Sequence, residues 1–240
     1  MRVVKACVTA MIVVAMPFAV QIAARQMDAD RKIPDGGIKI AGWKGRIDPQ
    51  STKAGGTIND SKVSGTDKDM KLEIGPAAVY WNPANTASGD YTIKATFTEP
   101  HYMSANSHDH PYGIFIGGNK MDTEEMTLLY CVPYGDGRVL IRGFNPTANA
   151  GARNAGAFTV QPAAANEAVH KAADKGASVT QEVMWTVKGG TAACSVNGKV
   201  VGTFTKDQIV GAGKLDSLDG VYGIRVSHNV DVNVTGFGKQ

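Results

Sequence analysis

The sequence has little clustered basic charge, which argues against a nucleic-acid partner. Setting aside the first 24 residues removes Arg2 and Lys5, which leaves 23 basic residues against 22 acidic ones. The remaining chain is therefore nearly neutral, and no run of Lys or Arg forms a stripe that could follow a phosphate backbone. We expect no nucleic-acid binding.

Long amphipathic helices are also absent, whereas alternation of apolar and polar residues is frequent. In "YTIKATFT", residues 91–98, apolar side chains fall on one face and threonines and a lysine on the other, which is typical of a half-buried strand. Eight or more such segments follow each other at short spacing. Without crossover helices they must bury their apolar faces as two sheets or a barrel, and we favour a two-sheet sandwich. Asn197-Gly198 predicts a type I′ hairpin, and Asp136-Gly137 and Gly189-Gly190 indicate further turns.

The chain length suits one all-β domain, which we place at residues 40–240. Residues 25–39 show no clear periodicity and are predicted to be a flexible N-terminal segment. Residues 145–179 are rich in Ala, Gly and Asn and predict a long excursion over the sheet. Loops of this length are uncommon unless they serve binding or are mobile.

The N-terminus has the pattern of an export signal. Basic residues precede an apolar run from Ala6 to about Val20, and Ala23 and Ala24 follow as small residues at a cleavage site. Because Pro17 interrupts this run, a membrane-spanning helix is the weaker interpretation. We expect residues 1–24 to be removed, the mature protein to be secreted or periplasmic, and no stable membrane insertion after cleavage.

Two cysteines, Cys131 and Cys194, remain after such cleavage, and each lies on a predicted strand. An oxidising compartment would allow them to form a disulfide. The alternative is that both are buried thiols that pack as small apolar residues.

The order of segments resembles a known superfamily. The signal is followed by "GWKGRID", "LEIGPAAVYWNP", "SGDYTIKATFTEP", "YGIFIGG", "WTVKGGTAACSVNGKVVGTF" and "DGVYGIRVSHNVDVNVTGFG". This series is similar to the concanavalin A-like lectin/glucanase jelly roll, most nearly to exported bacterial proteins related to the 3-keto-disaccharide hydrolase-type domain of unknown function. The resemblance implies an all-β, two-sheet antiparallel jelly-roll sandwich over about residues 40–238. It says little about chemistry, because one fold hosts many functions.

A retaining glucanase would need two carboxylates at alternate positions on one strand. The nearest match is "GNKMDTEEMTLLY", in which Asp122 and Glu124 share a face but Met126 occupies the third position. The superfamily's Glu-x-Asp-x-x-Glu type of pattern is therefore missing. A solvated turn is favoured here, and no catalytic residue is assigned.

The histidine-rich stretch "SANSHDHP" raises the question of a metal site. His108 and His110 could share a metal with His101 or Asp109. The composition is nevertheless that of a loop, and the sequence shows no obvious fourth ligand. We therefore interpret the stretch as a polar loop with exposed histidines and predict neither a metal nor a cofactor.

The favoured function is a non-catalytic module that binds a carbohydrate or another extracellular or envelope ligand. The alternatives are a glycosidase-like enzyme and a structural or assembly protein, and the sequence does not fix the oligomeric state. Sugar recognition uses aromatic rings and planar polar groups. Near strand ends, the predicted ligand-binding residues are Trp81, Asn82, Tyr112, Tyr130, Arg142, Asn145, Arg225, His228 and Asn229. Trp43 and Trp185 are assigned to the core instead.

Overall fold

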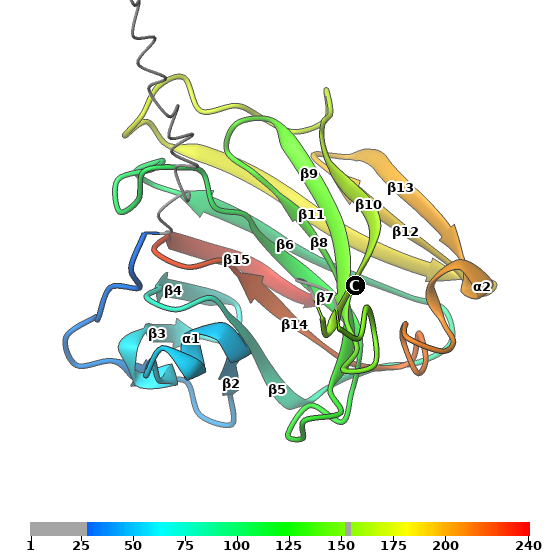
Figure 1. Ribbon diagram of the computed structural model, residues 1–240. Helices are drawn as coiled ribbons and strands as arrows, with labels where there is room; N and C mark the ends of the chain where they lie inside the picture. The colour runs from blue at the N-terminus through cyan, green and yellow to red at the C-terminus, as the bar shows by residue number, and fades with distance from the viewer. Residues whose placement is uncertain (1–27, 152–154) are drawn as a thin grey trace, which may run out of the picture.

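The computed structural model describes residues 28–151 and 155–240, which form mainly β-strands (Figure 1). The predicted signal peptide, residues 1–24, lies outside the described part of the chain. Among the described residues, no helix is both long enough and apolar enough to cross a membrane.

Two sheets face each other and enclose the core, so the predicted two-sheet antiparallel jelly-roll sandwich is confirmed. In spatial order, the eight-stranded sheet consists of β1 (Gly37–Ile38), β3 (Lys62–Thr66), β4 (Asp69–Glu73), β15 (Asp231–Lys239), β6 (Tyr91–Glu99), β11 (Val179–Lys188), β12 (Thr191–Val196) and β13 (Lys199–Thr205). The seven-stranded sheet consists of β10 (Ala157–Ala165), β9 (Arg138–Phe144), β8 (Thr127–Pro133), β7 (Tyr112–Asn119), β14 (Gly220–Val226), β5 (Ala78–Ala87) and β2 (Lys44–Ile47). The short helices are α1 (Pro49–Lys53), the 3₁₀ turn η1 (Ile58–Asp60) and α2 (Lys206–Ile209).

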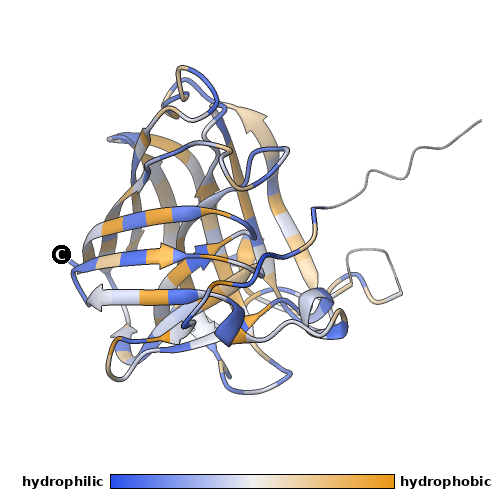
Figure 2. Ribbon diagram, turned by 90° about the vertical axis from the view of Figure 1, so that its left-hand side faces the viewer, coloured by the Kyte–Doolittle hydropathy of each residue, from blue (hydrophilic) through white to orange (hydrophobic). Residues whose placement is uncertain are grey.

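Strand pairing follows the hydrophobic alternation of the sequence. β6 is buried at every second residue, and its neighbour β11 alternates in the same way. Pairs such as Phe97–Gln181 and Ile93–Trp185 lie opposite each other in an antiparallel register. Figure 2 shows the resulting alternation of apolar and polar residues along the strands. The only parallel pair among the described strands is the short pair β1–β3.

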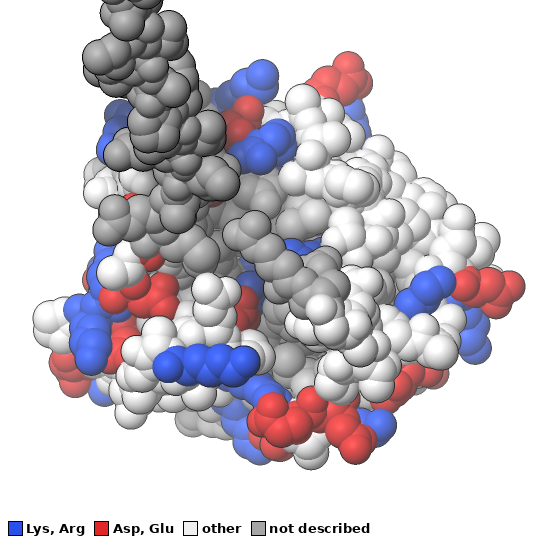
Figure 3. Space-filling view, in the orientation of Figure 1, with Lys and Arg blue, Asp and Glu red and all other residues white. Residues whose placement is uncertain are grey.

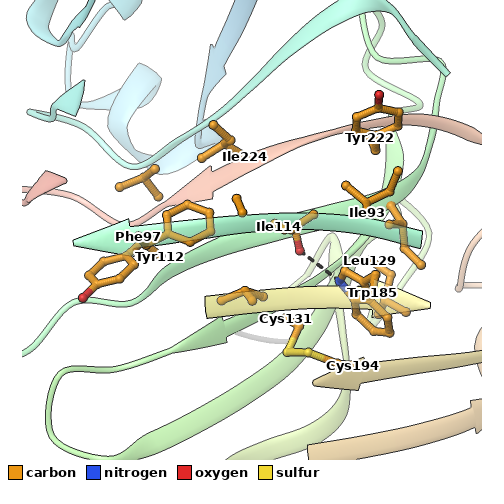
Figure 4. Packing of buried hydrophobic residues seen from close by; sticks show 14 of the residues in the cluster. Ile93, Phe97, Tyr112, Ile114, Leu129, Cys131, Trp185, Cys194, Tyr222 and Ile224 are labelled. Atoms are coloured by element: carbon orange, nitrogen blue, oxygen red, sulfur yellow. Dashed lines mark hydrogen bonds between the residues drawn. A yellow bond between two sulfur atoms is a disulfide. The ribbon is translucent and has the colours of Figure 1, made fainter. Parts of the chain in front are cut away.

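The core between the sheets contains a buried tryptophan with a satisfied polar group. Trp185 on β11 is fully buried, and its indole Nε1–H donates a 3.1 Å hydrogen bond to the carbonyl of Ile114 on β7 (Figure 4). Buried indoles usually need such a partner. This bond links the two sheets directly. Trp43 is also buried, as the sequence predicts.

The predicted hairpin at Asn197-Gly198 is confirmed. Both residues have positive φ, 49° and 80°, as a type I′ turn requires. Gly189 and Gly190, with φ of 55° and 75°, form the second tight turn. These turns connect β11, β12 and β13 into an antiparallel meander.

The region from 145 to 179 differs from the prediction of an excursion without strands. It contains β10, which pairs with β9 along the edge of the seven-stranded sheet. The pairing is interrupted by two register shifts, and Pro162 lies within the strand. Such bulges and prolines are typical of edge strands and hide the period-two pattern from sequence analysis.

Residues 28–39 are attached to the sandwich, which differs from the predicted flexible segment at 25–39. The amide of Arg31 donates to the side chain of Asn229, and its guanidinium Nε donates to the carbonyl of Ile74. The amide of Ile33 donates to the carbonyl of Asp60. Hydrogen bonds to distant residues, rather than local periodicity, therefore order this segment.

Charged side chains of both signs are interspersed over α1, β2 and β3 on the face shown in Figure 3. No patch of one sign covers the described residues of that face. The view agrees with the near balance of acidic and basic residues in the sequence.

Cys131 on β8 and Cys194 on β12 form a disulfide that joins the two sheets (Figure 4). Both residues are fully buried. The bridge spans 63 residues of sequence, so it shortens a long loop in the unfolded chain. In the chain-entropy model, a loop of this length corresponds to a stabilisation of about 4 kcal/mol.

We expect the protein, purified under oxidising conditions, to show no free thiol when it is denatured without reductant. The Cys131→Ala/Cys194→Ala variant should lower the free energy of unfolding by up to about 4 kcal/mol, because it restores entropy to the unfolded chain and removes two buried side chains. Thiol titration and urea unfolding measure these effects. Two titratable thiols in the unreduced wild type would contradict the prediction.

Candidate functional site

The nine predicted ligand-binding residues do not form one site. Trp81, Tyr112 and Tyr130 are each at most 4% exposed. Tyr112 belongs to the core between the sheets, whereas Trp81 and Tyr130 pack in a second apolar cluster on the other face of the seven-stranded sheet. Their rings are covered by neighbouring side chains, so they are not available for stacking on a sugar in this conformation.

Three predicted asparagines make hydrogen bonds that hold the backbone. The amide group of Asn145 donates to the carbonyl of Lys214, and the side chain of Asn82 accepts from the amide of Ala84. Asn229 bonds to the backbone of residues 29 and 31. These contacts give the three side chains a structural role.

Arg225 lies on the outer face of the seven-stranded sheet and is paired with Asp48. Two hydrogen bonds of 2.5 and 2.7 Å join the guanidinium to the carboxylate. The guanidinium also lies over the rings of Tyr130 and Phe144, at 5.5 and 5.2 Å from their centroids. Arg142 is half-buried nearby, and its Nε has no partner among the described residues.

An acidic cavity of about 250 Å³ lies beside this ion pair. Its walls come from the N-terminal segment, the α1 region and the loop after β14. The lining residues are Asp28, Ala29, Asp30, Asp48, Gln50, Ser51, Ala54, Ala77 and His228. Of the nine predicted site residues, His228 alone lines this cavity.

The stretch 101–111 is a loop, as predicted, but its histidines are not all exposed. His110 is 5% exposed, which differs from the expected solvated side chain. The loop is held to the rest of the fold by the ion pair between Asp109 and Arg138 and by a hydrogen bond from Asn106 to the carbonyl of Asn229. Asp109 therefore forms an ion pair with an arginine. It does not join His108 and His110 as a third potential metal ligand, which the sequence had allowed.

His228 takes the place expected for His101 or Asp109 beside the other two histidines. We call His108, His110 and His228 the histidine cluster; their ligand nitrogens all lie within 4.8 Å of one another. The ring centroids of His110 and His228 are 4.1 Å apart, and those of His108 and His110 are 4.3 Å apart. Three imidazoles from two distant segments are thus brought together at one side of the acidic cavity, because His228 belongs to both.

Two imidazoles of the cluster, those of His110 and His228, have lowered pKa values. Burial, together with repulsion from the neighbouring His228 and His108, lowers the pKa of His110 to about 3. Burial also lowers the pKa of His228, although the carboxylate of Asp30 opposes this change. At neutral pH both rings therefore keep a nitrogen lone pair.

Glu99 lies at the base of the same loop and is 4% exposed. Its Oε1 accepts a 3.0 Å hydrogen bond from the amide of Met103, and its Oε2 has no partner among the described residues. Burial, with a smaller contribution from the charges of Asp231 and Asp109, raises its pKa to about 7. The carboxyl group therefore titrates near neutral pH.

The carboxylates considered for glycoside hydrolysis point to the surface. Asp122 is paired with Lys44, and Glu124 is 92% exposed and paired with Arg46. Both lie in the turn before β8, as the interpretation of a solvated turn expects.

Sequence analysis missed Asp28, Asp30 and Asp48. The first two lie in the segment assumed to be flexible, and Asp48 precedes a short helix with no catalytic motif around it. The motif "MDAD" has no feature that indicates a site by itself. Only the path of the chain places these carboxylates next to His228.

No protein-family model matches the sequence, and no curated protein matches it. Several solved structures are similar in shape. A carbohydrate-binding module, CBM66 from Bacillus subtilis, has a TM-score of 0.47 and 11% identity, over 85% of this chain and 99% of that one. A protein of unknown function with a galectin-like fold from Bacillus subtilis has a TM-score of 0.48 and 11% identity, over 82% and 88%. The galectin LEC-6 from Caenorhabditis elegans has a TM-score of 0.37 and 16% identity, over 66% and 87%.

We predict that Glu99 makes the stability of the protein depend on pH. Because its folded pKa of about 7 lies above the ordinary value of 4.5, its stabilising effect is complete below about pH 4.5 and is lost as the pH rises through 7. The difference corresponds to at most roughly 3 kcal/mol. Relative to wild type, Glu99→Gln should therefore lose less unfolding free energy between acidic and mildly basic pH.

Urea unfolding of both proteins across this pH range measures the difference. Glu167→Gln is the matched control, because Glu167 has a side chain that is 86% exposed. Equal pH slopes for wild type and Glu99→Gln would contradict the prediction.

Proposed function

We propose that this chain is an exported, non-catalytic jelly-roll module that binds a neutral carbohydrate unit in the acidic cavity. The observation that carries the proposal is the composition of that cavity: three carboxylates, a serine hydroxyl and alanine methyl groups surround about 250 Å³. A space of this size is small for a binding pocket and suits one sugar ring rather than a long oligosaccharide.

The chemistry of the walls favours a hydroxyl-rich ligand. An ionised carboxylate has about four acceptor positions, so the hydrogen bond that Asp30 accepts from Ser51 and its contact with His228 leave acceptor capacity. Sugar hydroxyl groups can donate to such oxygens, while alanine side chains contact the C–H faces of a ring. An anionic ligand is disfavoured because the cavity already carries several negative charges.

The proposal of export is supported by the N-terminal signal pattern of residues 1–24 and by a buried disulfide between the sheets. The proposal of a binding module over an enzyme rests on Asp122 and Glu124, which form separate surface ion pairs. Ligand recognition then depends on the cavity and not on the covered rings of Trp81, Tyr112 and Tyr130.

We expect the mature protein to bind neutral glycans on an array. At least one of these glycans should also show saturable binding in calorimetric titration. Ala54→Trp should abolish that binding, because Ala54 is an exposed residue of the cavity wall and an indole there would fill the space. The matched control is Ala164→Trp, an exposed position on the edge strand β10.

The array is run with and without EDTA, so that binding by the sugar alone can be told apart from binding that needs a metal. Binding of no neutral glycan under either condition would overturn the proposal. Equal affinity of wild type and Ala54→Trp would also overturn it, because the ligand would then lie elsewhere.

A further inference from the structure

The histidine cluster consists of three imidazoles contributed by two loops. His108 and His110 precede β7, and His228 follows β14. One ligand nitrogen from each ring lies within 4.8 Å of the other two. Nitrogens bound to one tetrahedral Zn²⁺ at about 2.0–2.1 Å are roughly 3.4 Å apart, so a modest approach of the rings would be enough.

Hydrogen bonds occupy the Nδ1 atoms of two rings of the cluster. Nδ1 of His228 lies 2.9 Å from a carboxylate oxygen of Asp30, and Nδ1 of His110 lies 2.9 Å from the hydroxyl of Ser227. A carboxylate can only accept, so His228 carries its proton on Nδ1 and keeps the lone pair on Nε2. Metal-bound histidines commonly have such a carboxylate or hydroxyl partner on the second nitrogen.

The Nε2 atom of His110 is the strongest single indication of a ligand. His110 is 95% buried, being 5% exposed, and this nitrogen has no hydrogen-bond partner among the described residues. Buried polar atoms without a partner are rare because they lose the hydrogen bonds of water and gain nothing in return. A metal ion between the three rings would satisfy this nitrogen.

Nearby charge is also suited to a divalent cation. The carboxylate of Asp28 lies 3.7 Å from Nδ1 of His108, and that of Asp30 contacts His228. Neither aspartate has a Lys or Arg ion-pair partner among the described residues, whereas Asp48 is paired with Arg225 and Asp231 with Arg31. The two carboxylates place negative charge beside the three imidazoles, which a divalent cation would complement.

We propose that His108, His110 and His228 bind one divalent transition-metal ion of the zinc type through their Nε2 atoms. Asp28 orients the ring of His108, and Asp30 orients the ring of His228. Three imidazole ligands select borderline ions such as Zn²⁺, whereas Ca²⁺ and Mg²⁺ require oxygen ligands. Three protein ligands leave a fourth position for water or another small donor. The argument for this site does not depend on the carbohydrate proposal.

The test uses the mature chain, freed of metal with EDTA and dialysed, and titrated calorimetrically with ZnCl₂. We expect one zinc ion per chain, a melting temperature that rises with zinc concentration, and no response to CaCl₂. X-ray absorption at the zinc edge should show three imidazole nitrogens at about 2.0–2.1 Å.

Matched variants distinguish specific zinc binding at the histidine cluster from nonspecific binding by other histidines. His108→Ala/His110→Ala should lose saturable zinc binding, whereas His101→Ala/His170→Ala, which removes the two exposed histidines outside the cluster, should bind as wild type. Because His110 is buried and its loss could disturb folding, Asp30→Asn is the second variant. It keeps the side-chain shape and should weaken zinc binding about 10- to 100-fold by removing the carboxylate behind His228.

No saturable zinc binding by the folded wild type would overturn the proposal. It would also be overturned if His108→Ala/His110→Ala or Asp30→Asn bound zinc as tightly as wild type. Glycan binding that persists in EDTA, together with absent zinc binding, would refute this inference while leaving the carbohydrate proposal intact. Zinc binding by a protein that binds no neutral glycan would refute the carbohydrate proposal while leaving this inference intact.

Discussion

A single buried residue, Asn229, ties together the segments that form the site. Its side chain accepts from the amide of Arg31 and donates to the carbonyl of Ala29, and its own amide donates to the carbonyl of Gly75. Its carbonyl in turn accepts from the side chain of Asn106. Asn229 has φ of 51°, a left-handed conformation that asparagine tolerates better than most residues. The N-terminal segment, the histidine loop and the turn after β14 therefore meet at one asparagine.

Close packing around this residue leaves little freedom for substitution. A Cβ at Gly75 would lie 2.1 Å from the carbonyl oxygen of Arg31 and 2.5 Å from that of Asp60. Backbone atoms cannot move away as the end of a long side chain can, so the glycine is needed for the N-terminal segment to lie this close to the sheet. The positions of Asp28 and Asp30 thus depend on a backbone contact just outside the cavity, between Gly75 and Arg31.

The fold could be predicted because short stretches of the sequence indicate its strands and turns. Alternating residues define β6 and β11, and Asn197-Gly198 defines a turn that only positive φ allows. The edge strand β10 could not be predicted, because its register shifts break the alternation. The site is different in kind: His110 and His228 are far apart in sequence, and their proximity depends on how β7 and β14 pair in the same sheet. Local composition indicates a polar loop, and only the pairing of strands supplies the third imidazole.

The chemistry of the cluster also fits the compartment that we propose. In an oxidising environment, Cys131 and Cys194 are joined in a disulfide, so neither supplies a thiolate to a metal. Imidazoles do not form disulfides and keep their lone pairs under the same conditions, provided that they are neutral. Burial supplies that condition for His110 and His228 by lowering their pKa values. The oxidised cysteines therefore stabilise the sandwich, while the histidines remain available as ligands at its edge.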